Sequence, residues 1–467
     1  MSFQTNLSII NLTPYDWTGY TLAETTGLIE WDFPKTLASG DTYEASIVVD
    51  TSQGSNPTKA QADWPFSWID QAHPVADLKI SVSGEGDGDG GGYEYAINAV
   101  LDQFGTQRNP KGSTISIPLY DQAWSPFLLV GDNTSLAGNN PPLDWMEQSL
   151  PFIGCLTLQD IVLPGSHDAG MSQINYAHGG DSDNSQTQTL SVGGQLEAGM
   201  RYFDIRPSIS HGQFYTGHYT DQLGANGESM ADIISDVNAF TAKGFNELVV
   251  LELSHSLDTD SGYDAFNDAQ YKNLLTQLSG LKYLYTGHAS DVLTTVRLGE
   301  FISSSPAVVV VCDERDLNWL SANKFSGKGF YGPGQLPVYN NYADTTDLDT
   351  MRQDQWTKFS SQVKTPQTPN QLFLLSWTFT QDVLGAIGIG FGGANEDGTS
   401  ILESATYFNN FLAQTGGTVP YTGPLEWAKK AGKPPNIILI DNVPTDNRFL
   451  ATLCLGMTRW FNRQQKC

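Results

Sequence analysis

Short apolar strands alternate with amphipathic helices through the last two thirds of this 467-residue chain, and this rhythm constrains its fold more than any other feature. Eight strands are expected, over residues 161–164, 202–205, 213–216, 248–253, 307–312, 336–339, 372–377 and 436–440. Apolar residues at helical spacing lie between them, as in Met230, Ile233, Ile234 and Val237. Because buried strands joined by helices form parallel sheets, this α/β pattern predicts a (β/α)8 barrel of the TIM type over residues 150–467.

Residues 1–140 show a different pattern, in which short strand-like runs are separated by Gly, Pro, Asn and Asp. Such runs are typical of a β-sandwich, so we expect an N-terminal all-β accessory domain. The insert at residues 84–92, GEGDGDGGG, contains Glu85, Asp87 and Asp89. A flexible hairpin tip is favoured over a calcium loop, because the insert lacks the distal Glu of an EF-hand.

An excess of acidic residues limits the possible partners. The chain has 24 Lys and Arg against 51 Asp and Glu, a formal net charge of -27. This charge repels nucleic acid and strongly anionic membranes, so an anionic substrate would need a few cations inside a cleft. The first residues lack the features of a signal peptide, and no stretch approaches about 18 uninterrupted apolar residues. We therefore expect a soluble protein, either cytoplasmic or secreted without a signal peptide.

The four cysteines, Cys155, Cys312, Cys454 and Cys467, lack the spacing of a zinc site. A short loop closed by Cys454 and Cys467 is compatible with the sequence, and so are free thiols. The choice stays open at this point, because disulfides depend on the redox compartment.

Polar residues gather where the predicted strands end, which is where the catalytic groups of a barrel lie. His167, Arg206 and His218 follow or end three successive predicted strands, and Asp441 ends the last one. Two histidines and an arginine suit in-line displacement at phosphorus. One imidazole takes a proton from the attacking hydroxyl, the other protonates the leaving oxygen, and the guanidinium binds the phosphoryl oxygens. Asp168 and Asp441 can fix the histidine tautomers.

Four segments carry a resemblance to a known family: LTLQDIVLPGSHDAG, GGQLEAGMRYFDIRP, FYTGHY and ELVVLELSH. Together they resemble the catalytic X region of phosphatidylinositol-specific phospholipase C and the related PLC-like phosphodiesterases, over about residues 156–256. The GSHDA and RYFDIR segments are the most specific. The resemblance implies a distorted (β/α) barrel, in agreement with the strand pattern.

The resemblance also implies a role for each catalytic residue. His167 would be the general base that takes the proton of the inositol 2-hydroxyl. His218, assisted by Asp168, would be the general acid that protonates the diacylglycerol oxygen. Arg206 would stabilise the phosphorane, with Asp204 holding its guanidinium, and the carboxylate after the last strand would orient the base. The implied products are a cyclic inositol phosphate and diacylglycerol.

The same resemblance predicts that no metal is used. Calcium-dependent members have Asn, Glu, Asp and Glu where this sequence has Asp168, Asp204, Arg206 and Ser254. A guanidinium at Arg206 can supply the charge that calcium supplies elsewhere, as in the metal-independent bacterial type. The alternative is a metal site formed by His167, Asp204 and His218, or by His255, but Arg206 in its midst would repel a divalent cation.

Headgroup recognition departs from the characterised members. Metal-independent bacterial members hold inositol hydroxyls with a Lys after the fourth strand and an Arg after the fifth, where this chain has a Ser-His pair and an Asp-Glu pair. Another hydroxylated or glycosylated headgroup therefore stays open. The expected substrate-binding residues are Ser254, His255, Asn340, Tyr342 and Trp377.

A Gly-rich apolar segment follows the seventh predicted strand. Residues 388–393 match the pattern GxGxxG, but no βαβ unit with an acidic ribose partner accompanies it, so dinucleotide binding is disfavoured. For residues 383–391, VLGAIGIGF, packing against a neighbouring loop is favoured over insertion into a lipid interface.

The leading hypothesis is a phosphoric diester hydrolase or lyase that cleaves phosphatidylinositol or a related phospholipid. Its expected partners are a phospholipid or other phosphodiester and a transient membrane interface, without nucleic acid or cofactor. One alternative is a metal-dependent enzyme of the sphingomyelinase D or glycerophosphodiesterase kind. The other is a lipid- or glycan-binding protein with an inactive barrel.

Overall fold

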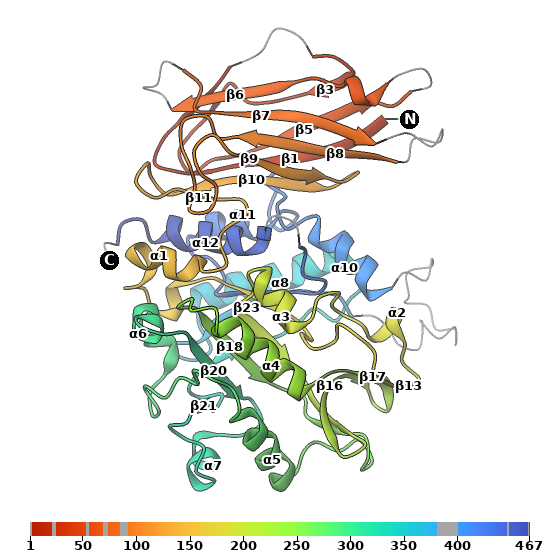
Figure 1. Cartoon of the computed structure of the whole chain (residues 1–467), viewed down its shortest axis with the longest axis vertical. Helices are drawn as coiled ribbons and strands as arrows, with labels where there is room; N and C mark the ends of the chain where they lie inside the picture. The colour runs from red at the N-terminus through yellow and green to blue at the C-terminus, as the bar shows by residue number, and fades with distance from the viewer. Residues whose placement is uncertain are drawn as a thin grey trace. The chain divides into compact units, whose positions relative to one another are not determined.

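The computed structural model describes residues 2–20, 25–52, 56–68, 73–84, 92–380, 400–445, 448–465 and 467. The chain divides into two compact units, whose elements are labelled in Figure 1. The first unit comprises Met1–Pro142, Asn410–Pro434 and Thr445–Gln464, and the second comprises Leu143–Asn409, Pro435–Pro444 and Gln465–Cys467. Residues 85–91 of the acidic insert and the Gly-rich segment 383–393 lie outside the described residues.

Two sheets of the first unit share one apolar core. One has the strand order β11-β10-β1-β5-β3 and the other β4-β2-β6-β7-β8-β9. Phe66 of β6 stacks on Trp17 of β2 and lies edge-on to Phe127 of β10, with ring centroids 6.0 Å apart in the second pair, so aromatic rings bridge the sheets. The strands are β1 (Ser2–Leu12), β2 (Trp17–Gly19), β3 (Leu28–Trp31), β4 (Thr36–Leu37), β5 (Thr42–Asp50), β6 (Asp63–Trp68), β7 (Ala76–Gly84), β8 (Tyr93–Val100), β9 (Thr114–Leu119), β10 (Trp124–Val130) and β11 (Ala137–Gly138).

Two C-terminal helices, α11 (Pro424–Ala431) and α12 (Phe449–Phe461), belong to this first unit. A Cβ at Gly456 of α12 would lie 3.2 Å from both Leu12 and Leu128, so glycine lets this apolar helix approach β1 and β10 closely. Thr42 of β5 donates a 2.9 Å hydrogen bond to Glu426 of α11. The expectation that all of residues 150–467 form the barrel differs from this division. Apolar periodicity predicts that a helix is buried but does not show which sheet buries it.

The second unit contains a sheet of eight parallel strands in the order β21-β20-β18-β14-β12-β24-β23-β22. The first of these strands in the chain, β12, pairs with the last, β24, as in a barrel. Strands β21 and β22 are the two edges, so the described strands form a curled sheet and not the closed ring expected from the sequence. The strands are β12 (Leu163–Ser166), β14 (Tyr202–Ile205), β18 (Leu248–Leu253), β20 (Ala307–Cys312), β21 (Phe330–Tyr331), β22 (Val338–Tyr339), β23 (Leu372–Trp377) and β24 (Ile437–Ile440).

The helices of the second unit connect these strands and include the helix that the apolar spacing of residues 230–237 predicts. Met230, Ile233 and Val237 of this helix are buried. The helices are α1 (Trp145–Ile153), α2 (Ser182–Ser185), α3 (Val192–Glu197), α4 (Met230–Thr241), α5 (Asp268–Leu278), α6 (Leu298–Ile302), α7 (Leu317–Ala322), α8 (Leu348–Lys364) and α10 (Ile401–Asn409), with 3-10 turns at Leu158–Asp160 and Leu293–Thr295.

The prediction is wrong for one of the eight barrel strands. Residues 213–216 lie in β16 (Gln213–Thr220), which belongs to a separate five-stranded sheet of the order β13-β17-β16-β15-β19. The position in the parallel sheet is taken instead by β21, which has only two residues and shows no recognisable period. The other strands of the separate sheet are β13 (Tyr176–His178), β15 (Pro207–Ser210), β17 (Leu223–Ser229) and β19 (Leu257–Asp258).

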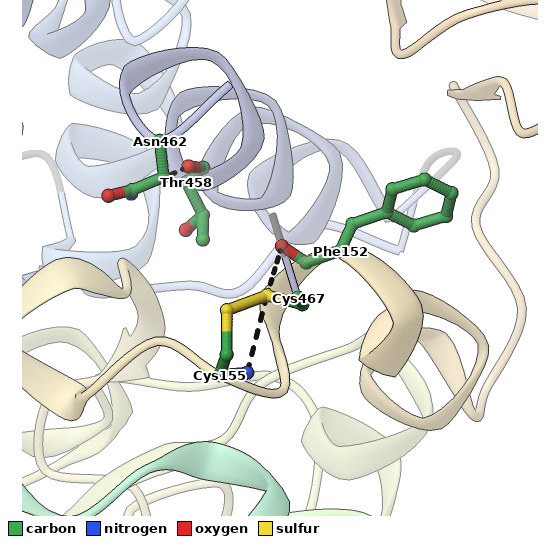
Figure 2. The surroundings of a disulfide bond; sticks show 5 residues. All are labelled: Phe152, Cys155, Thr458, Asn462 and Cys467. Carbon is green, nitrogen blue, oxygen red and sulfur yellow. Dashed lines mark hydrogen bonds between the residues drawn. A yellow bond between two sulfur atoms is a disulfide. The ribbon is translucent and has the colours of Figure 1, made fainter. Parts of the chain in front are cut away.

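A disulfide joins Cys155 to Cys467, the last residue of the chain, within the second unit (Figure 2). The N–H of Cys155 also donates to the sulfur of Cys467 at 3.3 Å. Cys312 and Cys454 are free and buried. Neither of the alternatives left open by the sequence describes Cys467, because its partner lies 312 residues away. Spacing alone cannot reveal such a pairing. None of the described helices has the length and hydropathy needed to cross a bilayer.

We expect two reactive thiols in the unfolded, unreduced protein and four after reduction, because one pair is bonded and two cysteines are free. A colorimetric thiol assay in denaturant gives the count. Replacing Cys155 or Cys467 with Ser should lower the free energy of unfolding by about 2–5 kcal/mol, because the unfolded chain is then less constrained. The two single variants and the double variant should be destabilised equally, and four reactive thiols before reduction would contradict the pairing.

Candidate active site

Three neighbouring strands bring most of the predicted catalytic residues to one edge of the parallel sheet. Strands β14, β12 and β24 lie side by side, and parallel strands end at the same edge. His167 and Asp168 directly follow β12, and Asp441 directly follows β24. Asp204 lies near the end of β14, and Arg206 directly follows that strand, two positions after Asp204 and on the same face.

The imidazole of His167 is held from two sides. Nδ1 lies 2.7 Å from Oδ1 of Asp441, and Nε2 lies 2.7 Å from Nη2 of Arg206. The backbone is also fixed, because the N–H of His167 donates to the carbonyl of Ile440 and the side-chain amide of Gln188 donates to the carbonyl of His167 at 2.8 Å. In the neutral imidazole, these contacts place the proton on Nδ1 and leave Nε2 as the acceptor. Sequence reasoning did not identify Gln188, which lies in a loop without a motif.

The guanidinium of Arg206 contacts two carboxylates. Its Nε lies 2.5 Å from Oδ1 of Asp168 and 3.1 Å from Oδ2 of Asp204. Burial lowers the pKa of Arg206, but Asp168 and Asp204 outweigh this effect and keep the pKa above its ordinary range. The arginine side chain is 23% exposed, whereas the carboxylates are 0% and 6% exposed. The guanidinium therefore stays charged and keeps part of its surface toward solvent, where it can bind an anion.

The second histidine comes from the separate five-stranded sheet. Nδ1 of His218, on β16, lies 2.8 Å from Oδ2 of Asp168, so one carboxylate bridges His218 and Arg206. Gly170 permits this close approach, because a Cβ there would lie 2.3 Å from the side chain of Thr216 on the same strand. Asp168 has a φ of 40°, a strained left-handed conformation for a residue with a side chain. Burial raises the pKa of Asp168, but Arg206 and the two histidines outweigh it and hold the pKa well below its usual range.

The charges around His167 favour its protonated form. Burial lowers the pKa of His167, and Arg206 lowers it further, but the carboxylates of Asp441 and Asp168 outweigh both and raise it to about 9. The contact between Nε2 and Arg206 belongs to the neutral form, which becomes dominant above that pH. Because the folded pKa is raised, His167 stabilises the folded state at pH below about 6.5, and this stabilisation is lost as the pH rises through about 9.

A buried acid lies beneath this cluster. Glu252 of β18 is in register with Asp204 of β14, and the hydroxyl of Tyr202 donates to Glu252 at 2.5 Å. Burial raises the pKa of Glu252 to about 8, and Asp204 and Asp313 reinforce the shift. Glu252 is therefore protonated at neutral pH. Because side chains alternate between the two faces of a strand, the RYFDIR segment places Tyr202 on the same face as Asp204. This period-2 pattern is the sequence signal that could have placed Tyr202 beside the catalytic cluster.

The arginine occupies the position that a metal ion would need. Single ligand atoms of His167, Asp168 and Asp204 lie within 4.8 Å of one another and could in principle hold a cation. Arg206, however, contacts all three of these residues, at 2.7 Å, 2.5 Å and 3.1 Å. A divalent ion would have to displace a guanidinium that two carboxylates already neutralise. The donor set therefore does not fit a metal while Arg206 is in place.

The five predicted substrate-binding residues fall into two groups. Ser254 and Trp377 are buried, with 5% and 1% of their surface exposed. Ser254 donates to Asp204 at 2.8 Å, and the indole of Trp377 donates to the carbonyl of Phe408 at 3.0 Å, so both bind protein groups and we no longer expect them to touch substrate. The other three predicted residues are exposed: His255 lies after the end of β18, and Asn340 and Tyr342 lie after the end of β22.

Titration of His167 tests this electrostatic arrangement. We expect a pKa of about 9, because Asp441 and Asp168 stabilise the imidazolium. Asp441→Asn should lower the pKa, since it removes the larger of these two favourable charges. The proton chemical shifts of the imidazole ring, followed by NMR between pH 5 and 10, give both values. A wild-type pKa at or below about 6.5 would contradict the arrangement.

Comparisons with known proteins agree with the resemblance seen in the sequence. No family model matches the chain. The chain is 27% identical over 136 residues to the human PI-PLC X domain-containing protein 2, covering 24% of this chain and 43% of the relative. It is 24% identical over 209 residues to a 1-phosphatidylinositol phosphodiesterase of Staphylococcus aureus, covering 41% of this chain and 62% of the relative.

The chain therefore spans about half the length of these curated relatives. Among solved structures, it is similar to a phosphatidylinositol-specific phospholipase C from Staphylococcus aureus, with a TM-score of 0.45 and 18% identity, covering 67% of this chain and 97% of that one. The sequence matches confirm the predicted resemblance: this chain is similar to the PI-PLC X-domain proteins and to the bacterial 1-phosphatidylinositol phosphodiesterases.

Proposed function

We propose that this protein is a phosphodiesterase that cleaves phosphatidylinositol or a related phospholipid. One observation carries the proposal. A single buried carboxylate, Asp168, holds Arg206 at 2.5 Å and His218 at 2.8 Å, and His167 lies 2.7 Å from the same guanidinium. Two imidazoles thus flank one cation that is partly exposed, as in-line transfer at an anionic phosphodiester requires. The similarity to phosphatidylinositol phosphodiesterases agrees with this chemistry.

In this proposal, substrate binding frees the general base. The reactive form is neutral His167, which is the minor form at neutral pH because the pKa is about 9, and in this form Nε2 accepts a hydrogen bond from Arg206. The anionic phosphodiester attracts the guanidinium, so Arg206 turns its donors to the phosphoryl oxygens and releases Nε2. Nε2 then takes the proton of the inositol 2-hydroxyl as that oxygen attacks phosphorus, and Asp441 stabilises the resulting imidazolium.

His218 completes the transfer as the general acid. Its Nδ1 is held by Asp168, so a protonated imidazole can offer the proton on Nε2 to the diacylglycerol oxygen as the P–O bond breaks. Arg206 neutralises the charge that develops on the equatorial phosphoryl oxygens. The products are a cyclic inositol phosphate and diacylglycerol. Each of the two proton transfers contributes about 10²–10⁴-fold to the rate.

We propose that the reaction needs no metal or cofactor, because Arg206 already supplies the positive charge at phosphorus. This favours the proposal over a metal-dependent enzyme of the sphingomyelinase D or glycerophosphodiesterase kind. The six proposed catalytic residues form one connected set of polar contacts, which disfavours an inactive barrel. We further propose a transient membrane interface as the partner, with a zwitterionic or weakly anionic surface, since a net charge of -27 opposes strongly anionic lipid and nucleic acid.

Two further proposals concern the chain as a whole. The first unit, with two sheets on one core, would be a β-sandwich accessory module. The disulfide between Cys155 and Cys467 favours an oxidising compartment over the cytoplasm, because reducing compartments keep most thiols free.

Incubation with phosphatidylinositol in mixed micelles tests the activity directly. With EDTA present, we expect a cyclic phosphate ester, detected by phosphorus NMR, because no metal takes part. His167→Ala and His218→Ala should each lower kcat by at least about 10²-fold, measured at a temperature at which thermal unfolding shows both variants to be folded. An unchanged rate in both variants would contradict the roles of the histidines, and activity that EDTA abolishes would favour the metal-dependent alternative.

Arg206→Lys tests the role of the guanidinium separately. We expect a loss of about 10²-fold or more in kcat, because one ammonium cannot contact Asp168 and Asp204 and also bind two phosphoryl oxygens. Steady-state kinetics on the same micelles give the value. Arg352→Lys is the matched control, because Arg352 is a buried arginine outside this cluster, and its kcat should stay near wild type. A lysine variant with wild-type kcat would show that Arg206 does not act at phosphorus.

A further inference from the structure

Ser254 lies in the layer that supports the catalytic cluster. It directly follows β18, its N–H donates to the carbonyl of Ile205 at 3.0 Å, and its side chain is buried. Its hydroxyl donates to Oδ1 of Asp204 at 2.8 Å. The position therefore ties the end of β18 to the end of β14 through both the backbone and the side chain.

Asp204 needs this donor because it is a buried charge. The residue is 4% exposed, and its two oxygens have different partners. Oδ2 contacts Nε of Arg206 at 3.1 Å and the N–H of Asp168 at 3.3 Å. On Oδ1, the hydroxyl of Ser254 is the donor found among the described residues. Removing it would leave one side of a buried carboxylate without a partner and free the group to rotate.

His255 determines how the hydroxyl of Ser254 points. Nδ1 of His255 lies 2.9 Å from Oγ of Ser254. A hydroxyl has a single proton, and Asp204 can only accept when ionised, so the proton of Ser254 goes to Asp204 and His255 must donate through Nδ1–H. This donation fixes the hydroxyl rotor toward Asp204. His255 itself is exposed and has a φ of 49°, a left-handed conformation.

These contacts form one polar chain that ends at the general base. His255 donates to Ser254, Ser254 donates to Asp204, Asp204 accepts from Arg206, and Arg206 lies 2.7 Å from His167. Each contact fixes the next group, so a change at Ser254 reaches the guanidinium without touching it.

We propose that Ser254 is a positioning residue that aims the guanidinium of Arg206 by holding Asp204, and that His255 orients the hydroxyl of Ser254. This inference rests on the proposed function for its kinetic consequence. Ser254 does not contact substrate in this role. It differs from the substrate-binding role that the sequence suggests, because the hydroxyl is buried and already engaged.

Ser254→Ala is the decisive variant. We expect kcat toward phosphatidylinositol in mixed micelles to fall by about tenfold or more with little change in KM, because Arg206 acts mainly on the charge that develops at phosphorus. Ser254→Cys, which keeps the size but donates weakly, should lose as much as the alanine variant. Ser254→Thr, which keeps the hydroxyl, should recover most of the activity.

A double-mutant cycle separates positioning from a general structural role. In the Asp204→Asn background, Ser254→Ala should cost little further kcat, because the hydroxyl acts through the carboxylate. Ser256→Ala is the matched control: this serine lies in the same loop but bonds Glu314 and the N–H of Phe266, so kcat should stay near wild type. Thermal unfolding of each variant shows whether the fold is intact.

A second measurement does not depend on turnover. The exchange of the Arg206 Nε proton with solvent, followed by nitrogen-15 NMR on the full chain, should speed up in Ser254→Ala because the guanidinium is held less firmly. Wild-type kcat in Ser254→Ala, or an equal loss with and without Asp204, would overturn the inference. A wild-type protein that does not cleave phosphatidylinositol would overturn the proposed function, and unchanged proton exchange in Ser254→Ala would then overturn this inference independently.

Discussion

The organisation of the site depends on the charge of Asp168, a carboxylate with a side chain 0% exposed. A buried anion is stable only when cations or donors surround it, and here Arg206 and His218 lie 2.5 Å and 2.8 Å away. The arginine comes from the parallel sheet and the histidine from the separate five-stranded sheet. Neutralising Asp168 therefore requires residues from both sheets. The backbone of Asp168 is left-handed at this position. His218 is part of the site because the charge of Asp168 needs a second partner beside Arg206.

A second buried arginine in the same unit shows what a purely structural pair looks like. Arg201 contacts Glu247, and both side chains are 0% exposed. Its remaining donors bind the carbonyls of Leu196, Met200 and Leu143, so no donor is left for a ligand. Arg206 differs because its neighbours are shared with two histidines and 23% of its side chain is exposed. Both arginines lie in the segment RYFDIR, and only their contacts distinguish the structural arginine from the one that can bind an anion.

The sequence predicts those features that depend on local pattern. The ends of apolar strands located His167, Asp168, Asp204, Arg206 and Asp441, because parallel strands end at one edge regardless of what surrounds them. The sequence also predicts His218 as a site residue, but it assigns the strand of His218 to the parallel sheet, whereas that strand belongs to the separate five-stranded sheet. Period 2 is the same in both sheets, so the pattern cannot tell them apart. The partner of Cys467, the sheet that buries α12 and the buried state of Trp377 depend on long-range packing, and no local pattern encodes them.

Ser254 also explains how the charges of the cluster are balanced. In the calcium-dependent pattern, from which this sequence departs at residues 206 and 254, three carboxylates and a divalent cation at the four ligand positions leave one net negative charge. At the same four positions of this chain, Asp168, Asp204 and Arg206 also sum to one negative charge, before the two histidines are counted. A third carboxylate at residue 254 would add an uncompensated charge next to Asp204, and charges of one sign in a buried site repel strongly. Ser254 gives Asp204 a donor without adding charge, and Glu252, whose pKa is raised to about 8, adds none at neutral pH. With a guanidinium at residue 206, a neutral residue at 254 keeps the negative charge of the site from rising, so the two positions are linked electrostatically.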